Sequence, residues 1–175
     1  WKILESSKRR LIYSLLEFGL PLSNKHEDPE GGLEFEFLKD THERIMANEP
    51  VMTGHLDGTI TLNIAEADDA ERERRRLKLK EDFRTVLGHF RHEIGHYYWL
   101  LLIQNTGRFD SFRKMFGDEN LNYQNAMDRY YQHGANDSWR QSFISGYASS
   151  HPWEDFAESW GHYFTIIDPL ETSIQ

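Results

Sequence analysis

The segment His92-Glu-Ile-Gly-His96 constrains this 175-residue chain more than any other feature. It lies within a stretch from about residue 81 to residue 103, where large apolar side chains recur at helical spacing. On a helix, residues four apart differ by about 40° in direction, so both imidazoles face one point and can bind one divalent ion. Glu93 points about 100° away from His92, where a general base can lie beside a metal-activated water. The alternative is two ordinary histidines on a helix.

A third ligand is available on the last predicted helix, which begins at Pro152 and is expected to end near Ile167, before Asp168-Pro169. Glu154 and Glu158 share one strip of this helix, within about 40° of each other. The opposite face is aromatic and apolar and is expected in the core: Phe156, Trp160, Tyr163, Phe164 and Ile167. Carboxylates on such a helix are costly to bury without partners, and a metal with its histidines supplies them. The alternative is a solvated acidic strip, since Asp155 is also charged.

Helix geometry alone does not choose between the two glutamates. In sites of this kind one carboxylate binds the metal, and another, one turn later, accepts a hydrogen bond from a liganding histidine. The spacing of Glu154 and Glu158 suits this division of roles. Tyr147 lies seven residues before Glu154, on a segment that must bend into the helix, and its phenol is a candidate donor to the oxyanion of a tetrahedral intermediate.

Three further histidines have less specific interpretations. His89 shares the face of His92, and a hydrogen-bonded structural role is favoured over lining a cleft. His151 precedes Pro152, so helix capping or solvent exposure is favoured over contact with a substrate. His162 lies off the strip of Glu154 and is left out of the site.

Composition excludes several other classes of protein. The net charge of −9 argues against a nucleic-acid binder, and Arg72–Lys80 is expected to be a solvated basic helix face rather than an anion site. No cysteine is present, so any metal must be held by histidines and carboxylates. No signal peptide or apolar run of roughly 18 residues appears, so we expect a cytoplasmic protein that does not bind membranes. Because the chain begins with Trp1, we expect it to lie inside a longer product.

The rest of the chain predicts an α+β fold in a single domain over residues 1–175. An N-terminal helix is expected over residues 8–18, and alternation predicts a strand over 33–38. Asp57-Gly58 predicts a hairpin between strands at 51–55 and 59–64. These strands should form a small, mainly antiparallel sheet. Further helices are expected in the C-terminal half, which is mainly helical: 69–80, 81–103, 111–116, 123–132 and 152–167.

Two regions, His89–His96 and Tyr147–His162, resemble the gluzincin metallopeptidases. Within the second region, a tyrosine is followed seven residues later by a Glu-x-x-x-Glu motif, and this order resembles the lethal-factor-type members of that group. Five stretches resemble the bacterial putative zinc-binding metallopeptidase family over nearly the whole chain: residues 9–12, 53–55, 64–69, 89–99 and 151–158. Members often carry a cysteine-rich zinc ribbon before the peptidase domain, which this cysteine-free chain lacks.

The resemblance implies a zincin-like domain that binds Zn²⁺ through His92, His96 and Glu154. It further implies Glu93 as general base and Tyr147 as oxyanion donor. Glu158 would not bind the metal itself but would accept a hydrogen bond from a histidine that does. The expected function is hydrolysis of a peptide or protein substrate, with the Thr59–Ile64 strand pairing with that substrate if it is an edge strand. The alternative is a non-catalytic metal-binding regulatory or interaction protein on the same scaffold. The oligomeric state and cleavage specificity stay open.

Overall fold

The computed structural model describes residues 1–47, 49, 51–79 and 85–174. It contains two compact units, Trp1–Glu93 and Ile94–Gln175, and the division falls inside the continuous helix α4 (Val86–Trp99). The expectation of a single domain stays a prediction. Among the described helices, none is both long and apolar enough to cross a membrane.

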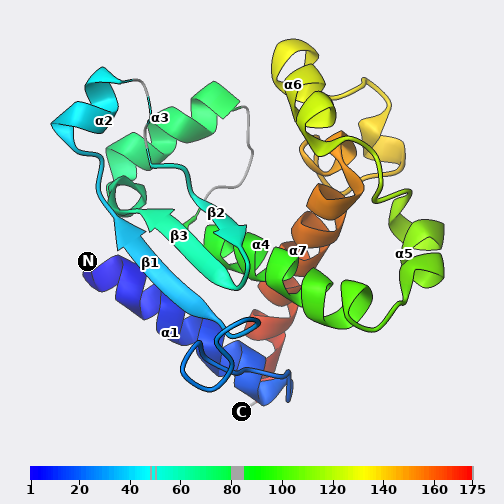
Figure 1. The fold of residues 1–175 in the computed structure, drawn as a ribbon, viewed down its shortest axis with the longest axis horizontal. Helices are drawn as coiled ribbons and strands as arrows, with labels where there is room; N and C mark the ends of the chain where they lie inside the picture. Colours follow the sequence, from blue (N-terminus) through cyan, green and yellow to red (C-terminus); the bar gives the residue numbers. More distant parts are fainter. Residues whose placement is uncertain (48, 50, 80–84, 175) are drawn as a thin grey trace. The chain divides into compact units, whose positions relative to one another are not determined.

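The first unit contains a three-stranded sheet in the order β1-β3-β2, formed by β1 (Glu34–Leu38), β2 (Gly54–Leu56) and β3 (Thr59–Asn63) (Figure 1). The hairpin prediction is confirmed, because β2 pairs antiparallel with β3 and Asp57 and Gly58 both adopt the positive φ values of a tight two-residue turn, 46° and 83°. The prediction of a mainly antiparallel sheet is wrong: β1 pairs with β3 in parallel over five residues, which makes the sheet mixed. The 59–64 segment is also not an edge strand, because β3 is hydrogen-bonded on both sides.

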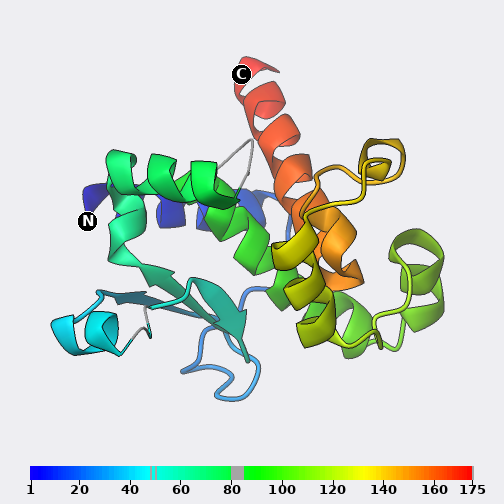
Figure 2. The same cartoon turned by 90° about the horizontal axis from the view of Figure 1, so that it is seen from above.

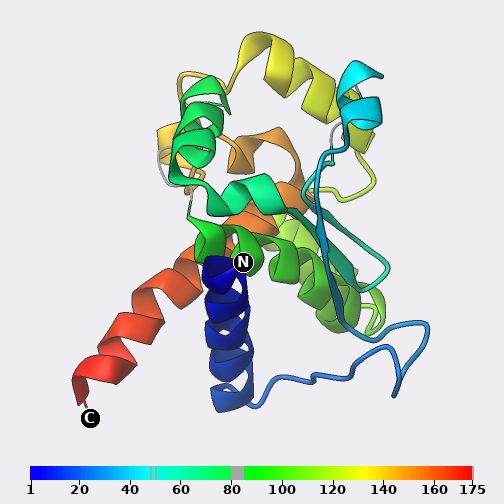
Figure 3. The same cartoon turned by 90° about the vertical axis from the view of Figure 1, so that its left-hand side faces the viewer.

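The core of the first unit forms where helices cover this sheet. Helix α1 (Lys2–Glu17) buries Leu4, Leu11 and Leu15, and it begins before the predicted residue 8. The alternation in β1 is confirmed: Phe35 and Phe37 both lie against the ring of Phe90 on α4, with centroids 5.7 and 6.1 Å away. Between α1 and β1 the chain forms a long irregular loop (Figure 3).

Two short helices and one charged helix complete the first unit: α2 (His42–Met46), the 3-10 turn η1 (Ile64–Ala67) and α3 (Asp69–Leu79). The predicted helix over 69–80 is confirmed to Leu79, and residue 80 lies outside the described residues. The side chain of Asp68 caps α3 by accepting a hydrogen bond from the Glu71 amide. Arg72 and Arg74 form ion pairs with Asp69 and Glu71. The side chains of residues 75–80 lie outside the described part of the chain, so the solvated basic face over Arg72–Lys80 stays a prediction.

The second unit is helical, as predicted. After α4 the chain forms a π-helical turn, η2 (Leu100–Gln104), and then α5 (Phe109–Phe116) and α6 (Tyr123–His133). Gly117 and Gly134 end α5 and α6 at positive φ, as predicted. The predicted helix over 81–103 begins only at Val86 in the described residues, and the part including Phe83 lies outside them.

The last helix, α7 (Pro152–Ile174), follows two 3-10 turns, η3 (Trp139–Gln141) and η4 (Ala148–Ser150). The predicted end at Asp168-Pro169 is wrong, because the helix continues through Pro169 (Figure 2). A proline removes one main-chain hydrogen bond, and the two turns of α7 before Pro169 contain buried Phe164 and Asp168. Tyr163, expected in the core, is 52% exposed.

Candidate metal centre

The centre begins with the close approach of α4 and α7 at a glycine. A Cβ atom on Gly95 would lie only 2.9 Å from the Cα of Ala157, so a side chain at this position would collide with the backbone of α7. One turn along, the rings of Tyr98 and Trp160 stack with centroids 4.9 Å apart. The absence of a side chain at Gly95 therefore allows α7 to approach α4 closely. Residues one turn away from Gly95 and Ala157 are consequently held near each other.

Three predicted ligands come together beside this contact. His92, His96 and Glu154 each offer one ligand atom, and these atoms lie within 4.8 Å of one another. His92 and His96 are one turn apart on α4, while Glu154 lies in the first turn of α7. Across the two helices, Nε2 of His96 is 3.5 Å from Oε2 of Glu154.

Tyr123 holds the carboxylate of Glu154, a relationship that the sequence did not predict. Its hydroxyl donates a hydrogen bond of 2.7 Å to Oε1 of Glu154, while Oε2 faces His96. Tyr123 is placed at the start of α6 because Asn122 caps that helix, accepting a hydrogen bond from the Asn125 amide. The capping asparagine is a recognisable signal for the helix start, but nothing in the sequence links Tyr123 to α7.

The alternative of a solvated acidic strip on α7 is wrong. Glu154 is 1% exposed and Asp155 is 8% exposed. Burial, followed by the negative charge of Glu158, raises the pKa of Asp155 to about 6. A carboxylate as deeply buried as Glu154 requires compensating partners, and Tyr123 and His96 lie on its two oxygens.

Glu93 follows His92 directly on α4 and is 7% exposed. On the regular helix α4, consecutive residues differ in direction by about 100°, so Glu93 does not share the direction of His92. Its role as a base stays a prediction.

Glu158 receives a hydrogen bond from outside α7. The hydroxyl of Ser145 donates to its Oε2 at 2.6 Å, and the same hydroxyl accepts from the amide of Ala148 at 2.9 Å. Ser145 therefore ties the segment before η4 to the second turn of α7. The predicted contact of Glu158 with a liganding imidazole stays a prediction.

Tyr147 lies in the bend before α7, whose geometry is fixed by serine hydroxyls. Ser149 and Ser150 donate to the carbonyl oxygens of Gly146 and Tyr147, both at 2.6 Å. The Tyr147 ring packs edge-on against Tyr130. Burial, and then the charge of Glu154, raises the pKa of Tyr147 well above its usual value, with a further contribution from a hydrogen bond with Tyr131.

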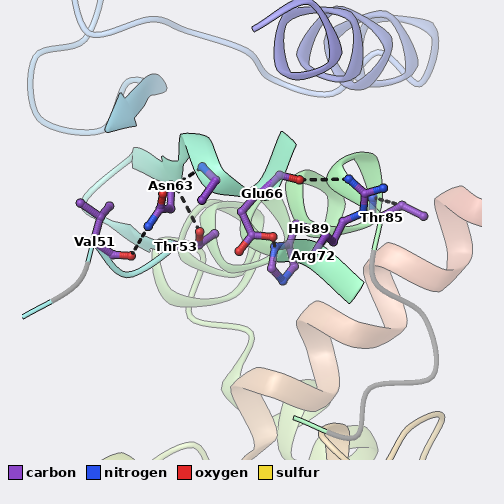
Figure 4. Close-up of polar contacts among 9 residues, drawn as sticks. Val51, Thr53, Asn63, Glu66, Arg72, Thr85 and His89 are labelled. Carbon is purple, nitrogen blue, oxygen red and sulfur yellow. Dashed lines mark hydrogen bonds and ion pairs between the residues drawn. The ribbon is translucent and has the colours of Figure 1, made fainter. Parts of the chain in front are cut away.

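His89 and His151 have structural roles. Nδ1 of His89 lies 3.4 Å from Oε2 of the fully buried Glu66, whose carbonyl accepts a hydrogen bond from Arg72 (Figure 4). His151 caps α7: its Nδ1 accepts from the Trp153 amide, so its Nε2 carries the proton and donates to the Leu121 carbonyl. Solvent exposure of His151 is excluded, since it is 2% exposed.

The donor set fits zinc. Two imidazole nitrogens and one carboxylate oxygen are ligands of a three-residue catalytic zinc site, which leaves a further position open. The hydrogen bond from Tyr123 to Glu154 is the kind of support that orients such a ligand.

Comparison with known proteins identifies the family of this chain. Residues 1–175 match the model of the family described as putative zinc-binding metallo-peptidase. The chain belongs to this family. The resemblance inferred from the sequence motifs is therefore confirmed for the metallopeptidase family, whereas the gluzincin and lethal-factor-type subdivision stays a prediction.

Relatives of this metallopeptidase family member occur in mycobacteria. Uncharacterized proteins of Mycobacterium bovis and of two strains of Mycobacterium tuberculosis are each 46% identical to it over 170 residues. The match covers 97% of this chain and 48% of each relative, so the chain spans about half the length of these relatives. No solved structure matches the chain.

Proposed function

We propose that this chain is the catalytic domain of a zinc-dependent, gluzincin-like peptidase that cleaves a peptide or protein substrate. The observation that carries the proposal is the meeting of His92, His96 and Glu154, with ligand atoms within 4.8 Å, beside the helix position of Glu93. Membership of the family described as putative zinc-binding metallo-peptidase supports the same chemistry.

The ligands are His92, His96 and Glu154, and Tyr123 fixes the orientation of Glu154. A zinc ion bound there supplies Lewis acidity, which lowers the pKa of a water towards about 7 and polarises a substrate carbonyl. Glu93 accepts the proton of the attacking water and returns it to the leaving amine. Tyr147 donates a hydrogen bond to the oxyanion that develops on the substrate carbonyl oxygen.

The decisive experiment compares the wild-type protein with Glu93→Gln. Both are expected to contain about one zinc per chain by elemental analysis, because Glu93 is not a ligand. Only the wild-type protein is expected to cleave a mixed peptide library, with products identified by mass spectrometry. A wild-type protein that neither contains nor takes up zinc would contradict the metal assignment.

The same pair separates catalysis from the alternative of a non-catalytic metal-binding protein. Zinc in both proteins with no cleavage by either would favour the binding role. Equal cleavage by both would remove Glu93 from the mechanism.

A further inference from the structure

A cavity of about 570 Å³ lies in the second unit, among the helices that carry Glu154 and its support. Its volume is in the range that holds a small ligand or a large side chain. Four aromatic residues contributed by different helices line it: Trp99, Phe109, Tyr123 and Trp153.

Two of these aromatic residues, Tyr123 and Trp153, adjoin the proposed zinc ligand Glu154, and a third, Trp99, packs against Trp153. Tyr123 donates to Glu154, and Trp153 immediately precedes Glu154 on α7. Trp99 follows His96 by three residues on α4, and its ring contacts that of Trp153 with centroids 5.2 Å apart. A group in the cavity therefore touches Tyr123, which orients the ligand Glu154.

The polar part of the lining carries no net charge. Arg113 donates two hydrogen bonds to Glu119, which is 6% exposed, and this pairing lowers the pKa of the Glu119 carboxyl. The pair thus consists of a guanidinium and a carboxylate that neutralise each other. The lining also contains the carboxamides of Gln104 and Asn120 and the hydroxyl of Tyr123, which donates to Glu154.

This composition favours an uncharged aromatic occupant. Aromatic walls gain from edge and face contacts with another ring. A charged side chain would lose hydration without a counter-charge, because Arg113 and Glu119 already satisfy each other. The carboxamide of Gln104 can bond to a phenol or to the main chain of a ligand, whereas the amide nitrogen of Asn120 already donates to Asp118 and Glu119.

We propose that this cavity receives an uncharged aromatic side chain of the peptide substrate and so sets the cleavage preference. The inference rests on the proposed peptidase function, because it assigns the cavity to the same site. Tyr123 connects the cavity to the proposed zinc site, because it forms part of the cavity wall and also orients the ligand Glu154.

The inference is tested by direct binding, which needs no turnover. N-acetyl-phenylalaninamide is titrated into the zinc-loaded protein, with the intrinsic fluorescence of its tryptophans as the signal, since Trp99 and Trp153 line the cavity. N-acetyl-aspartamide and N-acetyl-lysinamide serve as charged comparison probes. The aromatic probe is expected to bind at least about tenfold more tightly than either charged probe.

Variants locate the bound probe. Phe109→Ala removes one aromatic wall and is expected to weaken binding of the aromatic probe about 2- to 10-fold. Gln104→Phe, at an exposed position, fills the cavity with a ring and is expected to weaken it as well. Met115→Ala is the matched control on α5, because Met115 is 75% exposed and lies outside the lining.

Equal binding of the three probes, or wild-type affinity in both Phe109→Ala and Gln104→Phe, would overturn the inference. Cleavage of the peptide library without preference for aromatic residues near the cut bond would also overturn it, while leaving the peptidase function intact. Selective aromatic binding that both variants weaken would support the cavity assignment even if no peptide is cleaved, in which case only the peptidase function fails.

Discussion

The hydroxyl of Tyr123 donates a 2.7 Å hydrogen bond to Oε1 of Glu154, across 31 residues of sequence. Glu154 is almost fully buried, so this bond restricts which oxygen can face His96. A ligand carboxylate held in this way loses little conformational freedom when it binds a metal.

Tyr123→Phe removes this hydrogen bond and keeps the ring. Zinc affinity is expected to fall about 10- to 100-fold, the usual effect of losing a partner behind a metal ligand. Titration against a competing chelator measures it, with Tyr13→Phe on α1 as the control because Tyr13 is 59% exposed. Unchanged zinc affinity in Tyr123→Phe would show that the bond does not orient the ligand.

Glu154 and Glu158 are distinguished by the loss of zinc that follows their removal. Glu154→Ala leaves only the two histidines and is expected to abolish zinc retention. Glu158→Ala is expected to weaken zinc affinity only about 10- to 100-fold, because Glu158 is predicted to hydrogen-bond a liganding histidine rather than to bind the metal. The same chelator titration ranks the two variants. Greater damage from Glu158→Ala would move the ligand assignment by one helical turn.

Tyr147→Phe separates catalysis from metal binding. Loss of the proposed oxyanion donor is expected to lower kcat by about a hundredfold, equivalent to about 3 kcal/mol, while zinc affinity stays at the wild-type level. Initial rates on a peptide found in the library digest give kcat and KM separately. Tyr163→Phe, at a half-exposed position of α7, is the control and should cleave normally. An unaltered kcat in Tyr147→Phe would exclude the phenol from the reaction.

The parts that the sequence predicted correctly have local signals. Asp57-Gly58 encodes the tight turn between β2 and β3, and the glycines after α5 and α6 encode the ends of those helices. The shared direction of His92 and His96 follows from helical spacing. Glu154, rather than Glu158, was expected as their partner because of the family resemblance, and the structure brings these three residues together.

The features of the fold and the site that the sequence did not predict depend on contacts between residues far apart in the chain. Side-chain alternation in β1 shows that one face is buried, but it does not encode whether the neighbouring strand runs parallel or antiparallel, so the mixed sheet was missed. The contact of Tyr123 with Glu154 joins two helices, and no local pattern marks it. At Pro169 a local rule was overridden, because α7 continues beyond it.

Gly95→Ala tests whether the centre depends on the close approach of α4 and α7. Replacing a helical glycine by alanine normally stabilises a helix by about 1 kcal/mol. Here the new methyl would meet backbone and side-chain atoms at 2.9 to 3.3 Å, and overpacking of this kind costs about 1–3 kcal/mol. The nearest of these atoms is the Cα of Ala157, which cannot rotate away, so the steric cost is expected to exceed the helical gain. Urea unfolding should therefore give a lower free energy of unfolding for Gly95→Ala.

Gly88→Ala on the same helix is the matched control. Its methyl would meet only the hydroxyl of Thr85, at 3.0 Å, so stability is expected to change by less than about 1 kcal/mol. Because Gly95 lies between His92 and His96 on α4, Gly95→Ala should also weaken zinc affinity, and Gly88→Ala should not. Equal stability and equal zinc affinity in the two variants would mean that the ligands come together without the tight contact at Ala157.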